Sequence, residues 1–226
     1  MAADFPAAVL EAAGEEAGRT SMDIEKPKFT EEEYKQHFEA KEKALQDVLE
    51  SKCNLVGYDK IPFRIGGNVD LYCYSLTDQG TALVTMELIK PDGSGPIPNK
   101  TGTFELIACT RKKDSDGGQQ FLEEVIVRFS NIFTMLGEYS SVYNVEPGDT
   151  CEIPLEDEDI CLLFDEYKND EKKFIVNGRE HGLLLCIEIF RSEMEYAMEH
   201  GSDELIFYLK LLNHYPFSGL DRESVV

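Results

Sequence analysis

The apolar segment LLLCIEIF and its surroundings contain residue types that could support nucleophilic catalysis. Cys186 could supply a thiolate, His181 a base and Glu188 a carboxylate that orients the base. On a strand, however, Cys186 and Glu188 share one face, whereas His181 precedes Gly182 in an expected turn. Catalysis needs hydrogen-bond contact and an activating environment, and this spacing supplies neither. For this reason a small hydrolase that uses Cys186 with His181 is only the alternative hypothesis, and it is not the leading one.

An acidic run, Glu156-Asp157-Glu158-Asp159, could bind a hard cation through its carboxylate oxygens. It lacks the glycine and the distal glutamate of an EF-hand loop, and it directly precedes the strand expected at Ile160–Phe164. We interpret it as a charged loop and expect no metal, although a metal-dependent enzyme stays within the alternative.

The segment from Ser94 to Thr101 ends in Lys100-Thr101, as a phosphate-binding loop does. Ser94 and Asn99 stand where that motif has its two glycines, so the backbone could not wrap a phosphate closely. We expect no nucleotide and no other cofactor.

Tyrosines suggest a binding surface instead. Asp70, Tyr72 and Tyr74 alternate along one face of an expected strand, and Tyr139 and Tyr143 follow the longest apolar helix. Tyrosine anchors interfaces well because it brings a large contact area at a low cost in side-chain entropy. These five residues are the candidate partner-binding residues, with plain coverage of the core as the competing interpretation.

The elements that position these residues follow from hydrophobic periodicity. Thr30 and Glu33 form a capping-box pattern at the start of a helix that runs to about Glu50, and Gly137 is expected to end a second helix from Gln119. Further strands are expected after Gly66-Gly67 and at Thr81–Ile89, Thr103–Thr110, Ile160–Phe164, Lys173–Val176 and Leu183–Phe190. The order of elements predicts an α+β fold, with helices packed on a mixed, mostly antiparallel sheet.

Composition narrows the class of protein. The chain has 226 residues, no apolar run of the roughly 18–20 residues that span a bilayer, and no secretory signal. Its six cysteines are scattered singly, which favours reduced thiols and a cytoplasmic location. Residues 1–28 are rich in Ala, Gly and Glu, and we interpret them as a flexible leader before a domain at 29–226.

The net charge is −22. Nucleic-acid phosphates would be repelled, and no basic stripe compensates. A solvated acidic surface explains the charge most simply, and attraction to a basic partner protein is the functional interpretation. The sequence indicates nothing about oligomeric state.

The final fifty residues carry a resemblance to a known family. A strand at Leu183–Phe190, a helix that starts in Ser-Glu-Met-Glu-Tyr, a stop at His200-Gly201, a second helix and the ending Leu220-Asp221-Arg222-Glu223-Ser224-Val225 resemble the C-terminal part of the suppressor-of-fused family. Similar segments occur in the same order upstream, at Val69–Tyr72, Thr85–Leu88, Gly102–Ile107 and Leu136–Pro154. The resemblance therefore covers about residues 60–226, preceded by the helix within 29–50.

The resemblance implies a function as well as a fold. The family works by gripping other proteins; its animal member holds a short extended peptide by strand pairing and sequesters a transcription factor. This chain is similar to the short, single-domain bacterial members, which have been proposed as immunity proteins that neutralise a toxin. The resemblance thus implies a non-enzymatic module that binds, sequesters or inhibits a partner protein, either basic or presenting an extended peptide.

Overall fold

The computed structural model describes residues 28–49, 51–58, 60–63, 66–76, 79–113, 119–154, 159–169 and 172–226. The leader expected at 1–28 lies outside these ranges apart from Lys28, and so do Glu156, Asp157 and Glu158 of the acidic run.

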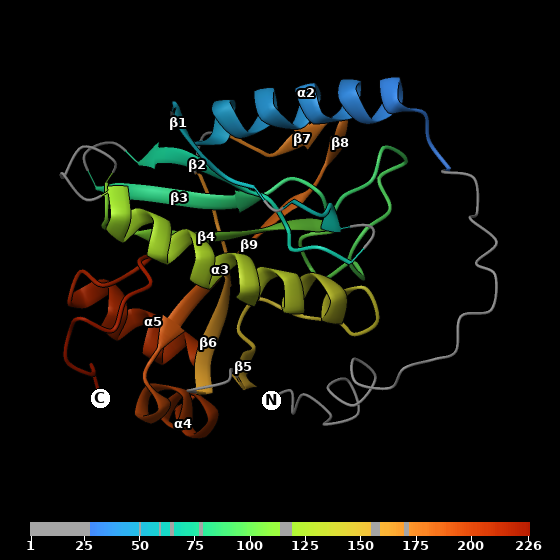
Figure 1. Cartoon of the computed structure of the whole chain (residues 1–226). Coiled ribbons are helices and arrows are strands. Elements are labelled where there is room, and N and C mark those ends of the chain that lie inside the picture. Colours follow the sequence, from blue (N-terminus) through green and yellow to red (C-terminus); the bar gives the residue numbers. More distant parts are fainter. Residues whose placement is uncertain are drawn as a thin grey trace, which may run out of the picture.

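A seven-stranded sheet forms the centre of the molecule (Figure 1). Its strand order is β1 (Lys52–Gly57), β2 (Leu71–Leu76), β3 (Gly80–Thr85), β4 (Phe104–Thr110), β9 (Gly182–Ile189), β6 (Asp159–Glu166) and β5 (Thr150–Pro154). Only the β4–β9 pair is parallel among these neighbours. The predicted α+β fold with a mixed, mostly antiparallel sheet is confirmed.

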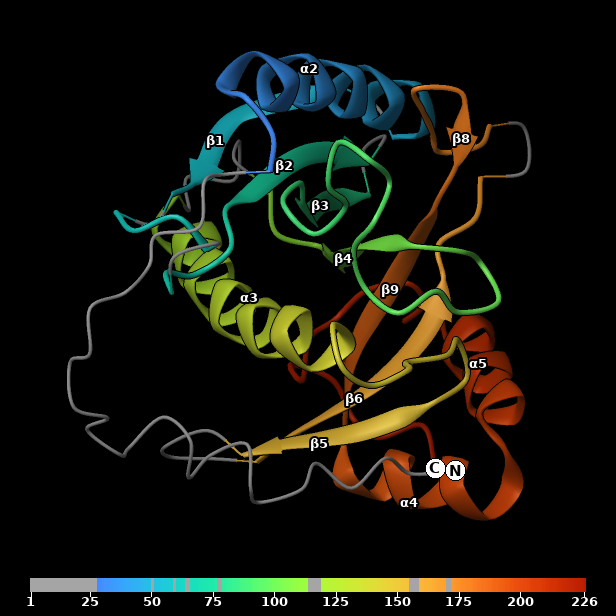
Figure 2. The same cartoon turned by 90° about the vertical axis from the view of Figure 1, so that its right-hand side faces the viewer.

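Helices cover both faces of this sheet. Helix α3 (Gln119–Ser140) packs on one face; α2 (Glu31–Val48), α4 (Arg191–His200) and α5 (Ser202–Leu211) contribute to the core on the other. Figure 2 shows α3 and α5 on opposite sides of the sheet. Alternation along β2 divides its side chains accordingly, with Leu71 and Cys73 under α3 and Tyr72 and Tyr74 on the α2 side.

Local sequence signals account for several boundaries. Thr30 and Glu33 form the expected capping box, in which Thr30 Oγ1 accepts from the Glu33 amide at 3.2 Å and Glu33 Oε2 accepts from the Thr30 amide at 2.7 Å. Asn177 and Gly178, both with positive φ, form the turn of a small hairpin between β7 (Ile175–Val176) and β8 (Arg179–Glu180).

Strand β7 begins at Ile175 rather than Lys173, and two other predicted boundaries are wrong by more than two residues. Strand β3 ends at Thr85 rather than Ile89, because the carboxylate of Glu105 accepts from the amides of Leu88 and Ile89 at 3.2 and 3.0 Å. Helix α3 continues past Gly137 to Ser140. A Cβ at Gly137 would lie 2.9 Å from Leu88 Cδ2, so this glycine permits close packing rather than ending the helix. Strands β1, β5 and β8 were not predicted.

The C-terminal segment is fastened by a buried ion pair at the start of α4. Arg222 donates from both terminal nitrogens to Glu193, at 2.5 and 2.7 Å, and the amides of Val225 and Phe190 donate to the same carboxylate at 2.9 and 3.0 Å. The Glu193 side chain is fully buried and that of Arg222 is 8% exposed. The two motifs that carry the C-terminal resemblance therefore meet in space, and their charged residues hold the chain end on the domain.

Replacement of Arg222 tests this fastening. Arg222→Ala leaves a buried carboxylate without its cation, so we expect the free energy of unfolding to fall by about 3–5 kcal/mol. Urea denaturation measures the change. Arg191→Ala is the matched control, because Arg191 pairs with Glu152 on the exposed side of the same helix. Equal losses in the two variants would contradict a special role for the buried pair.

Candidate binding site

A large pocket opens between α2, the segment that follows β1, the segment 86–96 and the end of α3. We call it the α2 pocket. Its volume is about 830 Å³, within the range typical of ligand-binding sites. Asp70 and Tyr72, two of the predicted partner-binding residues, line it together with Phe38, Phe63, Glu87 and Leu88. The pocket thus joins segments from distant parts of the sequence.

Lys41 and Glu105 form a buried ion pair beside the pocket. Their side chains are 1% and 0% exposed, and Lys41 Nζ lies 2.7 Å from Glu105 Oε1. Lys41 also donates to the carbonyls of Met86 and Ile89 at 2.5 and 2.7 Å. The other Glu105 oxygen accepts from Thr85 Oγ1 at 2.7 Å. The pair therefore ties α2 to β4 and fixes the course of residues 86–89, which form one wall.

His37 adds a second link between α2 and this wall. Its Nε2 lies 2.9 Å from the Ile89 carbonyl, and its Nδ1 lies 3.3 Å from the side-chain nitrogen Nδ2 of Asn177. Burial, reinforced by the charge of Lys41, lowers the pKa of His37. A neutral ring that donates from Nε2 and accepts at Nδ1 fits both contacts.

Two carboxylates lie in the inner wall. Asp70 and Glu87 are half-buried, and Glu87 Oε2 accepts from the Asp70 amide at 3.0 Å. Burial is the main cause that raises the pKa of Glu87, and the nearby Asp70 charge acts in the same direction. The inner wall therefore carries negative charge that water solvates poorly.

Aromatic rings surround these carboxylates. Tyr72 packs edge-on against Phe38, with ring centroids 5.3 Å apart. Lys52 Nζ lies 5.0 Å from the centre of the Tyr72 ring. Burial raises the pKa of the Tyr72 hydroxyl. Phe63 completes the apolar lining beside Gly137. Together the rings and carboxylates suit a ligand that has both an apolar stem and a positive charge.

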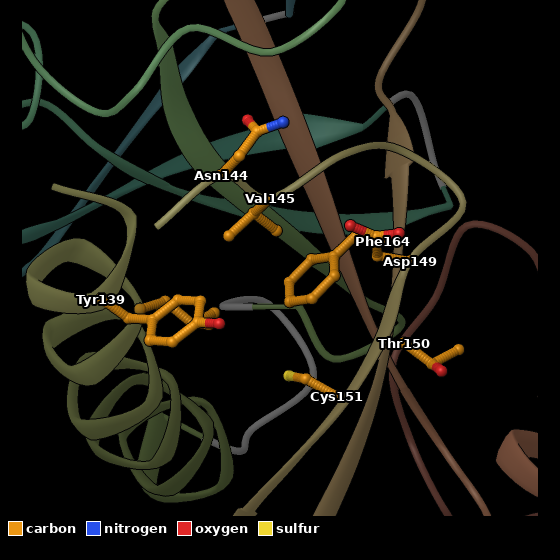
Figure 3. Close-up of a pocket in the computed structure, with 8 residues that line it drawn as sticks. Tyr139, Asn144, Val145, Asp149, Thr150, Cys151 and Phe164 are labelled. Carbon is orange, nitrogen blue, oxygen red and sulfur yellow. The ribbon is translucent and has the colours of Figure 1, made fainter. Parts of the chain in front are cut away.

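The remaining predicted partner-binding residues lie elsewhere. The Tyr74 side chain is fully buried, and its hydroxyl has no hydrogen-bond partner among the described residues. Tyr139 stacks on Tyr143, with centroids 4.8 Å apart, and only Tyr143 is well exposed. Figure 3 shows Tyr139 facing Phe164 across a small cavity of about 10 Å³. That volume holds at most one water molecule, so this cavity is no ligand site.

The residues of the enzyme alternative are separated in the fold. Cys186 is buried on the α3 face and bonds to the Leu184 carbonyl, whereas His181, five residues away, bonds to Thr103 Oγ1 at 2.7 Å and contacts Phe174 of the opposite core. Burial raises the pKa of the Cys186 thiol well above its usual value. Asp159 pairs with Arg191 at 3.4 Å, and the described residues contain no cluster of three side chains suited to a metal ion.

Three charged residues of the pocket region are not among the candidates predicted from the sequence. Lys41 stands in the apolar stripe of its helix, at a spacing that places it on the buried face. Glu105 interrupts an apolar strand, and Glu87 lies between Met86 and Leu88. A charged residue inside an apolar pattern was the available signal, because burial of a charge requires a partner.

Removal of the lysine charge should weaken the whole domain. Lys41→Met leaves Glu105 buried without its cation, so we expect a loss of about 3–5 kcal/mol in the free energy of unfolding. Lys43→Met, on the exposed side of the same helix, should change stability by no more than about 0.5 kcal/mol. Chemical denaturation of both variants makes the comparison. A Lys41→Met protein as stable as the Lys43→Met control would refute the anchoring role.

Glu87→Gln should stabilise the folded protein at neutral pH, whereas Lys41→Met should destabilise it. The folded protein raises the pKa of this carboxyl, so the ionised form is less favourable in the folded than in the unfolded state. The amide removes that penalty and can still accept from the Asp70 amide. We therefore expect greater stability than wild type at neutral pH, with a difference that shrinks as pH falls through the raised pKa. Urea unfolding over a pH series tests this, with the exposed Glu138→Gln as the control.

No protein-family model matches the chain. No curated protein sequence matches it either. Solved structures do match in fold. A crystal structure of the Sufu–Fu complex aligns with a TM-score of 0.56 at 14% sequence identity, over 85% of this chain and 91% of the other. A putative suppressor-of-fused homologue from Neisseria gonorrhoeae aligns with a TM-score of 0.51 at 11% identity, over 85% of this chain and 98% of the other. The chain therefore has a suppressor-of-fused-like fold.

Proposed function

We propose that this chain is a non-enzymatic protein-interaction module that binds a basic partner protein through the α2 pocket. The observation that carries this proposal is the pocket itself, a site of about 830 Å³ whose wall combines aromatic rings with two half-buried carboxylates. Tyrosine is enriched among the few residues that dominate the binding energy of an interface, and carboxylates give selectivity for cations.

The charge of the whole chain supports a basic partner. A net charge of −22 creates a long-range field that attracts cationic surfaces and raises their association rate. The pocket lies within this field, so the long-range attraction and the carboxylates of the pocket would both favour a basic partner. The fold comparison agrees with this class of function, since one of the similar structures is a complex of Sufu with Fu.

Strand pairing with an extended peptide remains a prediction. The sheet ends at β1 and β5, each of which has one neighbouring strand. Strand β5 is short and ends at Pro154, which lacks an amide donor, so it offers few bonds to an added strand. At the other edge, the pairing of β1 with β2 is irregular between Lys52 and Val56. Strand β1 leads directly into Lys60, Pro62 and Phe63 of the pocket. We therefore favour β1 as the edge that a peptide in the pocket would reach.

Sequestration or inhibition of the partner would follow from tight binding that covers a functional surface. An immunity-like inhibitor of a basic toxin is one form of this prediction, and a cytoplasmic location is a further one. Among the described residues, no helix has the length and apolar character needed to cross a membrane.

The enzyme alternative receives less support. Its thiol and imidazole face opposite sides of the sheet, and burial disfavours the Cys186 thiolate that nucleophilic attack requires. Residues 156–158 of the acidic run lie outside the described residues.

A salt series tests the proposal. The full chain is immobilised and exposed to native lysate, and the retained protein is identified by mass spectrometry and purified. We expect its association rate constant to fall at least about tenfold between low and high salt, because steering by exposed charges is screened. Stopped-flow measurements give the rate.

An unrelated protein of similar negative charge serves as the control bait, because it retains basic proteins without any specific site. A partner retained equally by both baits, or an association rate independent of salt, would contradict the proposal.

A further inference from the structure

Resting on the proposed function, we infer that the α2 pocket takes one lysine or arginine side chain of the partner, with Asp70 and Glu87 as the carboxylates that receive its charge. The apolar stem would lie against the rings of Tyr72, Phe38 and Phe63. This assigns a chemical class of ligand to the pocket and separates the residues that bind it from those that only shape it.

Glu87 is the strongest argument for a cationic ligand. Its one described hydrogen bond comes from the Asp70 amide, and none of the ion pairs among the described residues includes it. Its side chain is half-buried, and burial raises its pKa more than the Asp70 amide and the Lys41 charge lower it. An ammonium or guanidinium group beside it would compensate for this burial through a charge-assisted hydrogen bond.

The described lysines near Glu87 have other partners or lie exposed at the mouth of the pocket. Lys41 is buried and committed to Glu105 and to the carbonyls of Met86 and Ile89. Lys52 pairs with Glu42. The other lysines that line the pocket are exposed at its mouth, namely Lys35, Lys60 and Lys90. Glu87 thus has no ion-pair partner among the described residues, whereas the mouth of the pocket carries exposed charges of both signs.

Lys52 gives an internal precedent for the ring contacts. Its Nζ lies 5.0 Å from the centre of the Tyr72 ring and 5.9 Å from that of Phe38, distances at which a cation is attracted to an aromatic face. The pocket is larger than one side chain, so the residues that flank a basic anchor would also fit. An extended segment with a central lysine or arginine meets these requirements.

The test uses small probes and does not depend on the natural partner. N-acetyl-lysine methylamide, the arginine analogue and the norleucine analogue, which keeps the stem without the charge, are each titrated into the ¹⁵N-labelled full chain. We expect both basic probes to shift the amide signals of Asp70, Glu87 and Leu88, with dissociation constants of ~1–10 mM for ligands of this size. The norleucine probe should bind at least about tenfold more weakly.

Variants then test which residues bind the positive charge of the probes. Asp70→Asn with Glu87→Gln should weaken both basic probes at least about tenfold and leave the norleucine probe unchanged. Glu123→Gln, on the exposed surface of α3 and outside the pocket lining, should bind all three probes as wild type does. Equal binding of basic and neutral probes, or full binding by the double variant, would overturn the inference. The amide spectrum of each variant shows directly whether it is folded.

The same double variant separates this inference from the proposed function. If it binds the purified partner as tightly as wild type, the module function stands and the basic-anchor assignment fails. If no specific partner is retained by the wild-type chain, the proposed function fails, and the assignment to a partner side chain fails with it even where the probes bind.

Discussion

The buried pair of Lys41 and Glu105 is the interaction on which the rest of the pocket depends. Each ion lost its water on burial, and the structure compensates with a direct contact and with hydrogen bonds from Thr85 and the amides of Leu88 and Ile89. These bonds use the amides that would otherwise continue β3. The same interaction therefore ends a strand, turns residues 86–89 out of the sheet and holds α2 above them, which creates the space of the pocket.

The ionised Glu87 carboxylate in the pocket wall costs the folded protein stability, and the contacts around it do not require a charge there. Glu105 is fully buried but paired, whereas Glu87 is half-buried in the pocket wall and has a raised pKa. A glutamine there would keep the hydrogen bond and avoid the penalty. Charged groups held in unfavourable surroundings are common at functional sites, because the ligand supplies the missing interaction. This contrast between the two glutamates favours a cationic ligand over an empty structural groove.

Much of the fold was accessible from local patterns, and the site was accessible only in part. Periodicity identified α3 and the apolar strand β9, and the Thr30–Glu33 pattern placed the start of α2, because these signals involve neighbours along the chain. Asp70 and Tyr72 were identified from alternation on one strand. Tyr74 follows the same alternation yet is fully buried, since coverage by α2 is a long-range effect. The early end of β3 depends on Glu105, sixteen residues beyond Ile89, which no local pattern reveals.

The segments that resemble the family account for the architecture of the fold, but they do not identify a binding partner. Glu193 and Arg222, from two of those segments, pair in the interior and fasten the chain end, so their presence follows from architecture. The α2 pocket is different, because α2 precedes the region of sequence resemblance and supplies Tyr34, Phe38 and Lys41 to its lining. Asp70, Tyr72 and Glu87, by contrast, come from the resembling segments. Under the proposed function, the shared sheet would provide the scaffold, and α2 with the charges beneath it would determine the chemistry of the partner.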